Sequence, residues 1–284
     1  MPMVAQQAPY TLFIVDDDYA ESPRGEHRDN FGKMVCWHSR HNLGDEHDYS
    51  EPEDFLIDLC NNTVPKSEIV QMILDNKFEN LRFEPHEDDK NAYHIKSYCE
   101  IFKKWYTEAA YEAAPMDIKD TIVDVALPFL KNSELLDTLN DYSVILPLYL
   151  YDHSGITMNT SGFSCPWDSG QVGWIYADYN MIKKEYGEVT PETLERAKAL
   201  LESEVEEYDY YLTGQCYGYK LYEGDAEIDS CWGFLGSISD VSKHIKEHLP
   251  IECENIVDSL VFHSDIDEDE YLEQALDAED DLER

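Results

Sequence analysis

The sequence LPLYLYDHSGITMNTSGFSCPWDSGQVGWIY, residues 146–176, determines the fold that we expect for this chain. Apolar runs at residues 144–150 and 172–176 flank about twenty residues rich in Ser, Thr, Gly and Asn. Such runs are typical of buried strands, and a loop longer than ~12–15 residues is usually either functional or disordered. Because this loop contains Phe163 and Trp167, we predict an ordered loop between two strands.

The residues before this stretch contain strand patterns first and helix patterns later. We predict strands over residues 10–15 and 33–38, where β-branched and aromatic residues gather. Ser50 as N-cap, followed by Pro52 and several acidic residues, predicts the start of a helix. Apolar residues at helical spacing predict further helices over residues 67–78, 92–113, 118–127 and 133–139.

The residues after this stretch alternate between helix and strand patterns. Thr190 and Pro191 begin the longest predicted helix, and Gly214 ends it. A hairpin is expected to turn at Glu223-Gly224-Asp225 between two β-type runs. The remaining expectations are helices over residues 178–186 and 237–248, and a strand or helix over residues 255–262.

These patterns predict an α+β protein with a mostly antiparallel mixed sheet and segregated helices. We expect one α+β domain over residues 1–263, with a helical insertion at about 60–142, and an acidic tail over residues 264–284. The tail carries 11 acidic residues and one basic residue. It is predicted either to be solvated or to form a helix that docks through Tyr271, Leu272 and Leu276.

Cysteine recurs beside tryptophan in three places, at residues 36–37, 165–167 and 231–232. We interpret these as neighbouring strands of a single core. The seven cysteines are widely spaced and form no C-x-x-C motif, so no disulfide framework is expected. The N-terminus lacks the pattern of a signal peptide, and no apolar run reaches the ~20 residues of a membrane helix. A reduced, cytoplasmic location is therefore predicted.

The charge of the chain is strongly negative. Asp and Glu number 61 against 21 Lys and Arg, a net charge of −40, with −16 in residues 1–142 and −24 in residues 143–284. Such a surface repels nucleic-acid phosphates and anionic lipids, so neither is an expected partner. Three interpretations remain, namely a solvated surface, adaptation to high salt, or a surface that binds a basic partner.

The central loop contains the residue types of a thiol hydrolase. Cys165 would be the nucleophile, His153 its base and Asp168 the carboxylate that orients the base. Gly162 and Gly170 would leave backbone N–H groups facing an oxyanion. The alternative is a structural loop anchored in the core by Cys165 and Trp167, with His153 and Asp168 making hydrogen bonds within the loop.

Two other groups contain residue types that bind metals. The first group is Cys36, His38, His41 and His47, with Asp45, Glu46 and Asp48 nearby. Its histidine spacing is not a standard zinc spacing. The second group, Asp16-Asp17-Asp18, follows a predicted strand but lacks any phosphate-binding loop motif. We interpret it as a charged strand end, and we predict neither a metal nor another cofactor.

The predicted helix over residues 190–212 has an acidic outer face. Helical residues three or four apart stand ~5–6 Å from each other, a spacing that can imitate a row of DNA phosphates. A helical tail would add to this row. The residues that we predict to bind a partner are therefore Glu195, Glu202, Glu206, Asp209, Asp267, Asp269 and Glu270.

Four motifs resemble a family of uncharacterised proteins encoded by phages, plasmids and integrated mobile elements, mostly of Gram-positive bacteria. They are DNFGKMVCWHSRHNLGDEH (29–47), the stretch 146–176, SEVEEYDYYLTGQCYGY (203–219) and DSCWGFLG (229–236). Residues 25–28 depart from the family pattern, and residues 60–142 are not part of the resemblance. The resemblance implies an accessory gene of mobile DNA and transfers no functional residue.

Charge and resemblance together favour an anti-defence protein. We expect a cytoplasmic inhibitor that presents an acidic, nucleic-acid-mimicking surface to a host restriction, CRISPR or other nuclease system. Its partner would be a host protein with a basic nucleic-acid-binding surface, and the inhibitor is a candidate homo-oligomer. The alternative is a thiol- or metal-dependent hydrolase centred on residues 151–170, and a third interpretation is a structural module.

Overall fold

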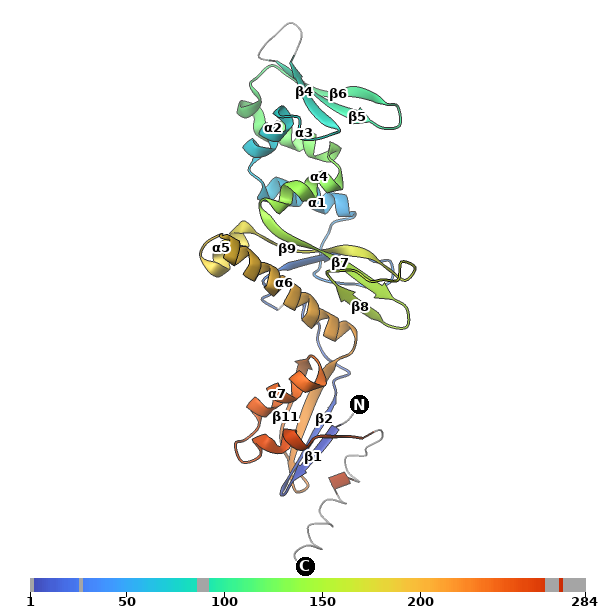
Figure 1. The fold of residues 1–284 in the computed structure, drawn as a ribbon, viewed down its shortest axis with the longest axis vertical. Coiled ribbons are helices and arrows are strands. Elements are labelled where there is room, and N and C mark those ends of the chain that lie inside the picture. Colours follow the sequence, from blue (N-terminus) through green and yellow to red (C-terminus); the bar gives the residue numbers. More distant parts are fainter. Residues whose placement is uncertain (1–2, 26–27, 86–91, 264–270, 273–284) are drawn as a thin grey trace, which may run out of the picture. The chain divides into compact units, whose positions relative to one another are not determined.

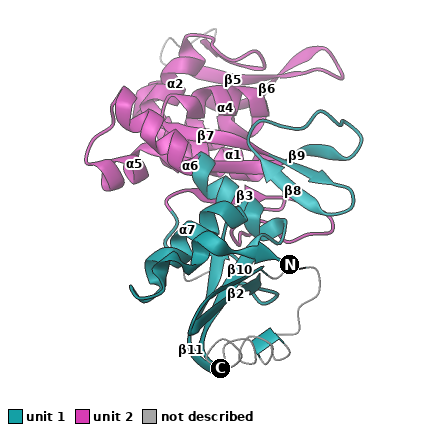
Figure 2. Cartoon of the chain, turned by 60° about the horizontal axis from the view of Figure 1, so that its bottom comes forward, with its two compact units in different colours: residues 1–30, 149–171, 202–284 teal, residues 31–148, 172–201 magenta. Residues whose placement is uncertain are grey.

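The computed structural model describes residues 3–25, 28–85, 92–263 and 271–272 (Figure 1). The chain divides into two compact units (Figure 2). Unit 1 contains residues 1–30, 149–171 and 202–284, and unit 2 contains residues 31–148 and 172–201. Each unit is therefore built from segments that are far apart in the sequence. Strands β7 (Ser143–Asp152) and β9 (Ser169–Asp178) and helix α6 (Pro191–Leu212) pass from one unit into the other.

Unit 1 is centred on a five-stranded antiparallel sheet with the order β11-β10-β2-β1-β12. The strands are β1 (Met3–Gln7), β2 (Tyr10–Asp16), β10 (Cys216–Glu223), β11 (Ala226–Leu235) and β12 (Val261–Phe262). Helix α7 (Ile238–His248) and the 3-10 helix η3 (Glu254–Ser259) pack on one face, against alternate residues such as Leu12 and Ile14. Successive residues of β2 thus contribute apolar side chains to the two opposite faces of the sheet.

The opposite face of this sheet carries a smaller apolar cluster. Val4 and Phe13 are buried there together with Leu272, and Tyr271 contacts Phe13 edge-on with ring centroids 5.7 Å apart. Tyr271 and Leu272, the two tail residues that the structure describes, have helical conformation. Asp267, Asp269, Glu270 and Leu276 lie outside the described residues.

Unit 2 combines a group of helices with a three-stranded sheet of order β4-β5-β6. The strands are β4 (Leu81–Pro85), β5 (Tyr93–Cys99) and β6 (Lys104–Tyr111). The α-helices are α1 (Pro52–Thr63), α2 (Lys66–Leu74), α3 (Lys119–Ala126), α4 (Asn132–Asn140) and α5 (Tyr179–Tyr186). Two 3-10 helices, η1 (Pro115–Ile118) and η2 (Leu127–Phe129), flank α3. The apolar faces of all of these elements except α5 form one continuous core. Phe55 of α1 is 1% exposed and contacts the rings of Tyr49, Trp174 and Tyr176.

The central stretch forms strands of a second antiparallel sheet, with the order β3-β9-β7-β8. Strand β3 (Lys33–Cys36) pairs with β9 in unit 2, and β8 (Ile156–Asn159) pairs with β7 in unit 1. The two predicted strands around the loop are thus confirmed. The loop is shorter than expected because β8 lies inside it.

Several sequence expectations are wrong. Residues 92–113, predicted to be helical, form the β5–β6 hairpin, in which only alternate positions of β5 such as Ile95 are buried. Helix α1 has Glu51 as N-cap rather than Ser50. The three Cys-Trp pairs do not share one core, because Trp167 is 91% exposed and Trp232 is 47% exposed. The α+β class with antiparallel sheets is confirmed.

Candidate functional site: an acidic unit with exposed aromatic residues

The negative charge is concentrated in unit 1 (Figure 2). Over the described residues, unit 1 carries 21 Asp and Glu against 5 Lys and Arg, a formal charge of −16 on 113 residues, whereas unit 2 carries 25 against 14, a charge of −11 on 142 residues. Counterions screen exposed charges beyond ~8 Å at physiological salt, so a local excess matters more than the total. Unit 1 is therefore the part of the chain best suited to attract a basic surface.

Unit 1 also exposes large aromatic side chains. Tyr19 is 94% exposed, Trp167 is 91% exposed and Trp232 is 47% exposed. The exposure of Trp167 corrects the prediction that this residue anchors the central loop in the core. Exposed Trp and Tyr side chains are the residue types that contribute most to protein–protein binding. These three rings are therefore accessible for contact with another molecule.

Helix α6 carries a stripe of carboxylates. Glu195, Glu202 and Glu206 are exposed, and at 100° per residue they lie on one side of the helix, about 16 Å from first to last. The opposite side, which includes Ala197, Leu201 and Val205, is buried, as the sequence predicted. The hydroxyl of Tyr210 donates to Glu206 Oε1 at 3.0 Å and positions that carboxylate.

Asp209 has a different environment from the other carboxylates of α6. Its Oδ1 accepts a hydrogen bond of 2.7 Å from the backbone N–H of Met158 in β8. Nearby, Arg24 forms an ion pair of 3.0 Å with Glu204, and both side chains are buried. These contacts attach β8 and the N-terminal segment to the C-terminal half of α6 within unit 1. The Asp209 carboxylate is thus already used to hold unit 1 together.

The Asp16-Asp17-Asp18 run follows β2, as predicted for a charged strand end. Asp17 accepts hydrogen bonds from the N–H groups of Tyr19 and Gly233, at 3.1 Å each, and its own N–H donates to the carbonyl of Cys216. Asp17 therefore fixes the turn. This turn and Trp232 line a pocket of ≈ 640 Å³ in unit 1.

The central loop does not assemble the expected triad. Cys165 Sγ donates to Asp168 Oδ2 at 3.5 Å. His153 is exposed, and its ring stacks on Tyr151 with centroids 6.3 Å apart. A catalytic thiol needs a base in contact with the sulfur, and among the described residues the structure places a carboxylate there instead of the histidine.

Thiol labelling tests whether the central loop acts by its cysteine. All seven cysteines are free, and burial raises the pKa of Cys60 to about 12. We expect iodoacetamide to label the partly exposed Cys99, Cys165 and Cys231 in the folded protein and to leave Cys60 unlabelled. Peptide mapping by mass spectrometry measures this. If the central loop is structural, Cys165→Ala leaves partner binding unchanged, whereas loss of an activity in this variant would establish the hydrolase.

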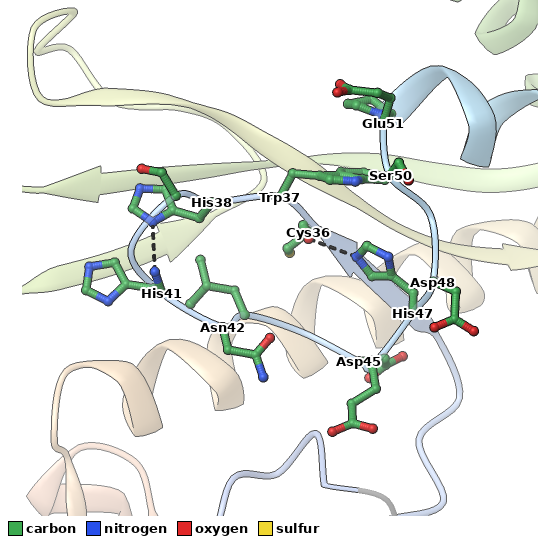
Figure 3. Close-up of a pocket in the computed structure, with 14 residues that line it drawn as sticks. Cys36, Trp37, His38, His41, Asn42, Asp45, His47, Asp48, Ser50 and Glu51 are labelled. Atoms are coloured by element: carbon green, nitrogen blue, oxygen red, sulfur yellow. Dashed lines mark hydrogen bonds between the residues drawn. The ribbon is translucent and has the colours of Figure 1, made fainter.

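Residues 36–52 of unit 2 line a pocket of ≈ 750 Å³ that contains the predicted metal-binding residue types (Figure 3). His38 Nδ1 accepts hydrogen bonds from the backbone N–H groups of Arg40 and His41, and the rings of His38 and His41 stack 5.0 Å apart. His47 Nε2 lies 2.9 Å from the carbonyl oxygen of Cys36 and must donate to it. These hydrogen bonds thus fix the conformation of the loop after β3.

These roles do not suit a metal site built from the predicted set. Nδ1 of His38 already accepts two backbone hydrogen bonds, and Nε2 of His47 already donates to a carbonyl oxygen, so both nitrogens are used within the loop. Within the described residues, no three of Cys36, His38, His41 and His47 bring donor atoms within 4.8 Å of one another. The Asp45 carboxylate, moreover, accepts from the N–H of Met34 at 2.9 Å.

No protein family, curated protein or solved structure matches the chain. Among the described helices, none has the length and apolar character required to cross a lipid bilayer. Sequence reasoning missed the pocket beside Trp232, because the Cys231-Trp232 pair was interpreted as core.

Proposed function

We propose that this protein is an anti-defence inhibitor in the cytoplasm of a host cell, where it binds the basic nucleic-acid-binding surface of a defence protein. The observation that carries the proposal is the charge of −16 on the described residues of unit 1 combined with the exposed rings of Tyr19, Trp167 and Trp232. Charge attracts a basic surface from a distance, and aromatic side chains supply contact area once it arrives.

The carboxylate stripe of α6 gives this proposal a geometric basis. Glu202 and Glu206 are four residues apart, so they stand ~6 Å apart along the helix axis. Phosphates of one DNA strand follow every ~3.4 Å along the duplex axis, so the stripe has the sign of a phosphate row at a lower charge density, and a groove lined by Lys and Arg attracts either row. Such a groove attracts an anionic helix and has no net charge interaction with a neutral one. Affinity should therefore rise with the number of carboxylates on the helix.

The resemblance to proteins of phages and plasmids supplies a biological setting. Mobile DNA that enters a host meets nucleases, and a protein that occupies their DNA- or RNA-binding surface protects it. This support is an analogy between classes of protein rather than a property of the site.

Competition with DNA tests the proposed function. The immobilised protein should retain nucleic-acid-binding proteins from a bacterial lysate at ~50 mM salt and release them by ~500 mM, because the contact is mainly ionic. Duplex DNA in the wash should release the same proteins, as identified by mass spectrometry. Retention that persists with excess duplex DNA, or retention of proteins that bind no nucleic acid, would contradict the proposal.

The alternative hydrolase retains one supporting observation, the hydrogen bond between Cys165 and Asp168. Among the described residues, His153 is exposed and stacks on Tyr151, and no hydrogen bond joins it to Cys165 or Asp168. We therefore favour the binding function.

A further inference from the structure

The turn of the β5–β6 hairpin exposes two large apolar side chains. Ile101 is 86% exposed and Phe102 is 66% exposed. They lie between paired residues Cys99 and Lys104, so a turn of four residues presents them. Single exposed apolar residues are ordinary, but two adjacent ones at the end of a hairpin indicate a contact surface.

The hairpin holds this turn in a defined position. Trp105 packs against Tyr98 with ring centroids 5.3 Å apart, and the Arg82 guanidinium lies 3.9 Å from the centroid of the Trp105 ring. Lys103 has φ of +52°, a left-handed conformation that usually favours glycine. Lys103 thus occupies a position that glycine would fill without strain, so Lys103→Gly removes the charge while the turn keeps its conformation.

The charge of this turn is opposite to that of most of the molecule. Lys103 and Lys104 follow Phe102, against one acidic residue, Glu100, and all three charged side chains are exposed. A basic surface would repel the two lysines. The complement of the turn must instead be an acidic surface with an apolar or aromatic hollow.

Unit 1 contains such a hollow, the pocket of ≈ 640 Å³ beside Trp232. Asp16, Asp17, Asp18 and Glu21 contribute four carboxylates to its lining, against one basic residue, Arg28. Tyr19 and Trp232 supply aromatic surface. The volume falls within the ~300–1,000 Å³ typical of pockets that bind small molecules, which is enough for a phenylalanine side chain and a neighbouring lysine.

Trp232 is a fixed wall of this pocket although half of it is exposed. A Cβ on Gly218 of β10 would lie 2.2 Å from Cε3 of Trp232, so the indole ring packs directly on the backbone of the neighbouring strand. The Gly233 N–H bonds to Asp17 and fixes the adjacent turn. A rigid aromatic surface loses little entropy on binding, and a tryptophan face attracts a cation.

We propose that the turn at Ile101–Lys104 of one copy docks into the Asp16–Trp232 pocket of a second copy. Phe102 would enter the pocket against Trp232, and Lys103 and Lys104 would face its carboxylates. The contact joins different surfaces of the two copies, so it is heterologous and can continue beyond a dimer. Because one turn buries far less than the ~1,200 Å² of a stable interface, the association is weak. This inference does not rest on the proposed anti-defence function.

Sedimentation velocity of the full chain tests the proposal. The wild type should sediment faster as its concentration rises from ~10 to ~500 µM at low salt, and the association should weaken at ~500 mM salt. The tip variant Phe102→Ser/Lys103→Gly keeps a backbone-compatible turn, and the pocket variant Asp18→Lys/Tyr19→Ser leaves Asp17 in place. Each variant alone should associate at least ~10-fold more weakly, because charge and apolar contact are both removed.

Mixing the two variants gives the decisive result. The tip variant retains an intact pocket and the pocket variant retains an intact tip, so an equimolar mixture should form a 1:1 complex and nothing larger. The control, Met116→Ser/Lys77→Ser, removes an exposed apolar residue and a lysine elsewhere in unit 2 and should behave as the wild type. A wild type that remains monomeric throughout, equal losses in tip variant and control, or no complex in the mixture would each overturn the proposal.

Discussion

Charge reversal at Glu202 and Glu206 is expected to weaken binding to the basic host surface by about 10- to 100-fold at low salt. Each Glu→Lys change replaces an attraction by a repulsion, and like charges brought together at an interface cost up to several kcal/mol. Both side chains are exposed on α6, so the helix itself tolerates lysine, which is a good helix former. Binding of the retained lysate proteins, measured by biolayer interferometry, gives the change.

A matched variant separates local from total charge. Asp124→Lys/Asp137→Lys changes the net charge by the same amount at two exposed helical positions of unit 2. We expect it to lower affinity by less than about 3-fold, because screening limits its effect to ~8 Å. Of the two variants, only the α6 variant should also show a weaker dependence on salt than the wild type. The logarithm of its affinity should fall less steeply with the logarithm of the salt concentration, because fewer ionic contacts remain.

Equal losses in the two variants would mean that total charge, not α6, attracts the partner. Unchanged binding in the α6 variant would remove Glu195, Glu202 and Glu206 from the proposed surface. Asp209 is left out of this test because its bond to the Met158 N–H would be lost together with the charge, and a folding defect would imitate a binding defect.

The elements predicted correctly are those whose ends carry local backbone signals. Gly187 and Gly214 end α5 and α6 with φ of +84° and +72°, a conformation that glycine adopts easily. Thr190 accepts a hydrogen bond of 3.2 Å from the N–H of Thr193 at the start of α6. The β10–β11 hairpin turns at Gly224, with φ of +62°. Such signals act within a few residues, so a sequence reveals them.

Residues 92–113 show where local reasoning fails. Ile95, Tyr98, Phe102 and Trp105 have helical spacing, yet the segment forms a hairpin in which Ile95 is buried and Phe102 is exposed. The β-branched and aromatic residues suit strands equally well. The pairing of β5 with β4 favours the strand conformation over the helix. This pairing joins residues 81–85 to residues 93–97, and the sequence between them has no clear pattern that would predict it.

The candidate surface was predictable only in part. The acidic face of α6 follows from spacing alone, whereas the concentration of charge in unit 1 depends on how three distant segments assemble. Exposure of Trp167 and Trp232 was missed because tryptophan is buried in most proteins. A sequence contains no direct record of which tryptophans face solvent.

Gly173→Ala is expected to destabilise unit 2 by about 3 kcal/mol or more, because a buried backbone contact leaves no room for a methyl group. A Cβ at this position would lie 2.0 Å from the carbonyl oxygen of Val35 and 2.9 Å from Cα of Cys36. Gly173 pairs with Cys36 in the β3–β9 ladder, so the two strands would have to separate. Urea unfolding followed by circular dichroism measures the loss.

Gly170→Ala in the same strand is the control. No atom lies within 4 Å of a Cβ at Gly170, so the free energy of unfolding should change by less than about 0.5 kcal/mol. Both glycines belong to the DSGQVG motif, which by itself does not distinguish them. If the two substitutions have equal effects, β3 and β9 do not approach as closely as described. A large difference would mean that the missing side chain of Gly173 allows β3 to pair with β9. In this arrangement the ring centroids of Trp37 and Trp174 are 6.1 Å apart in the core of unit 2.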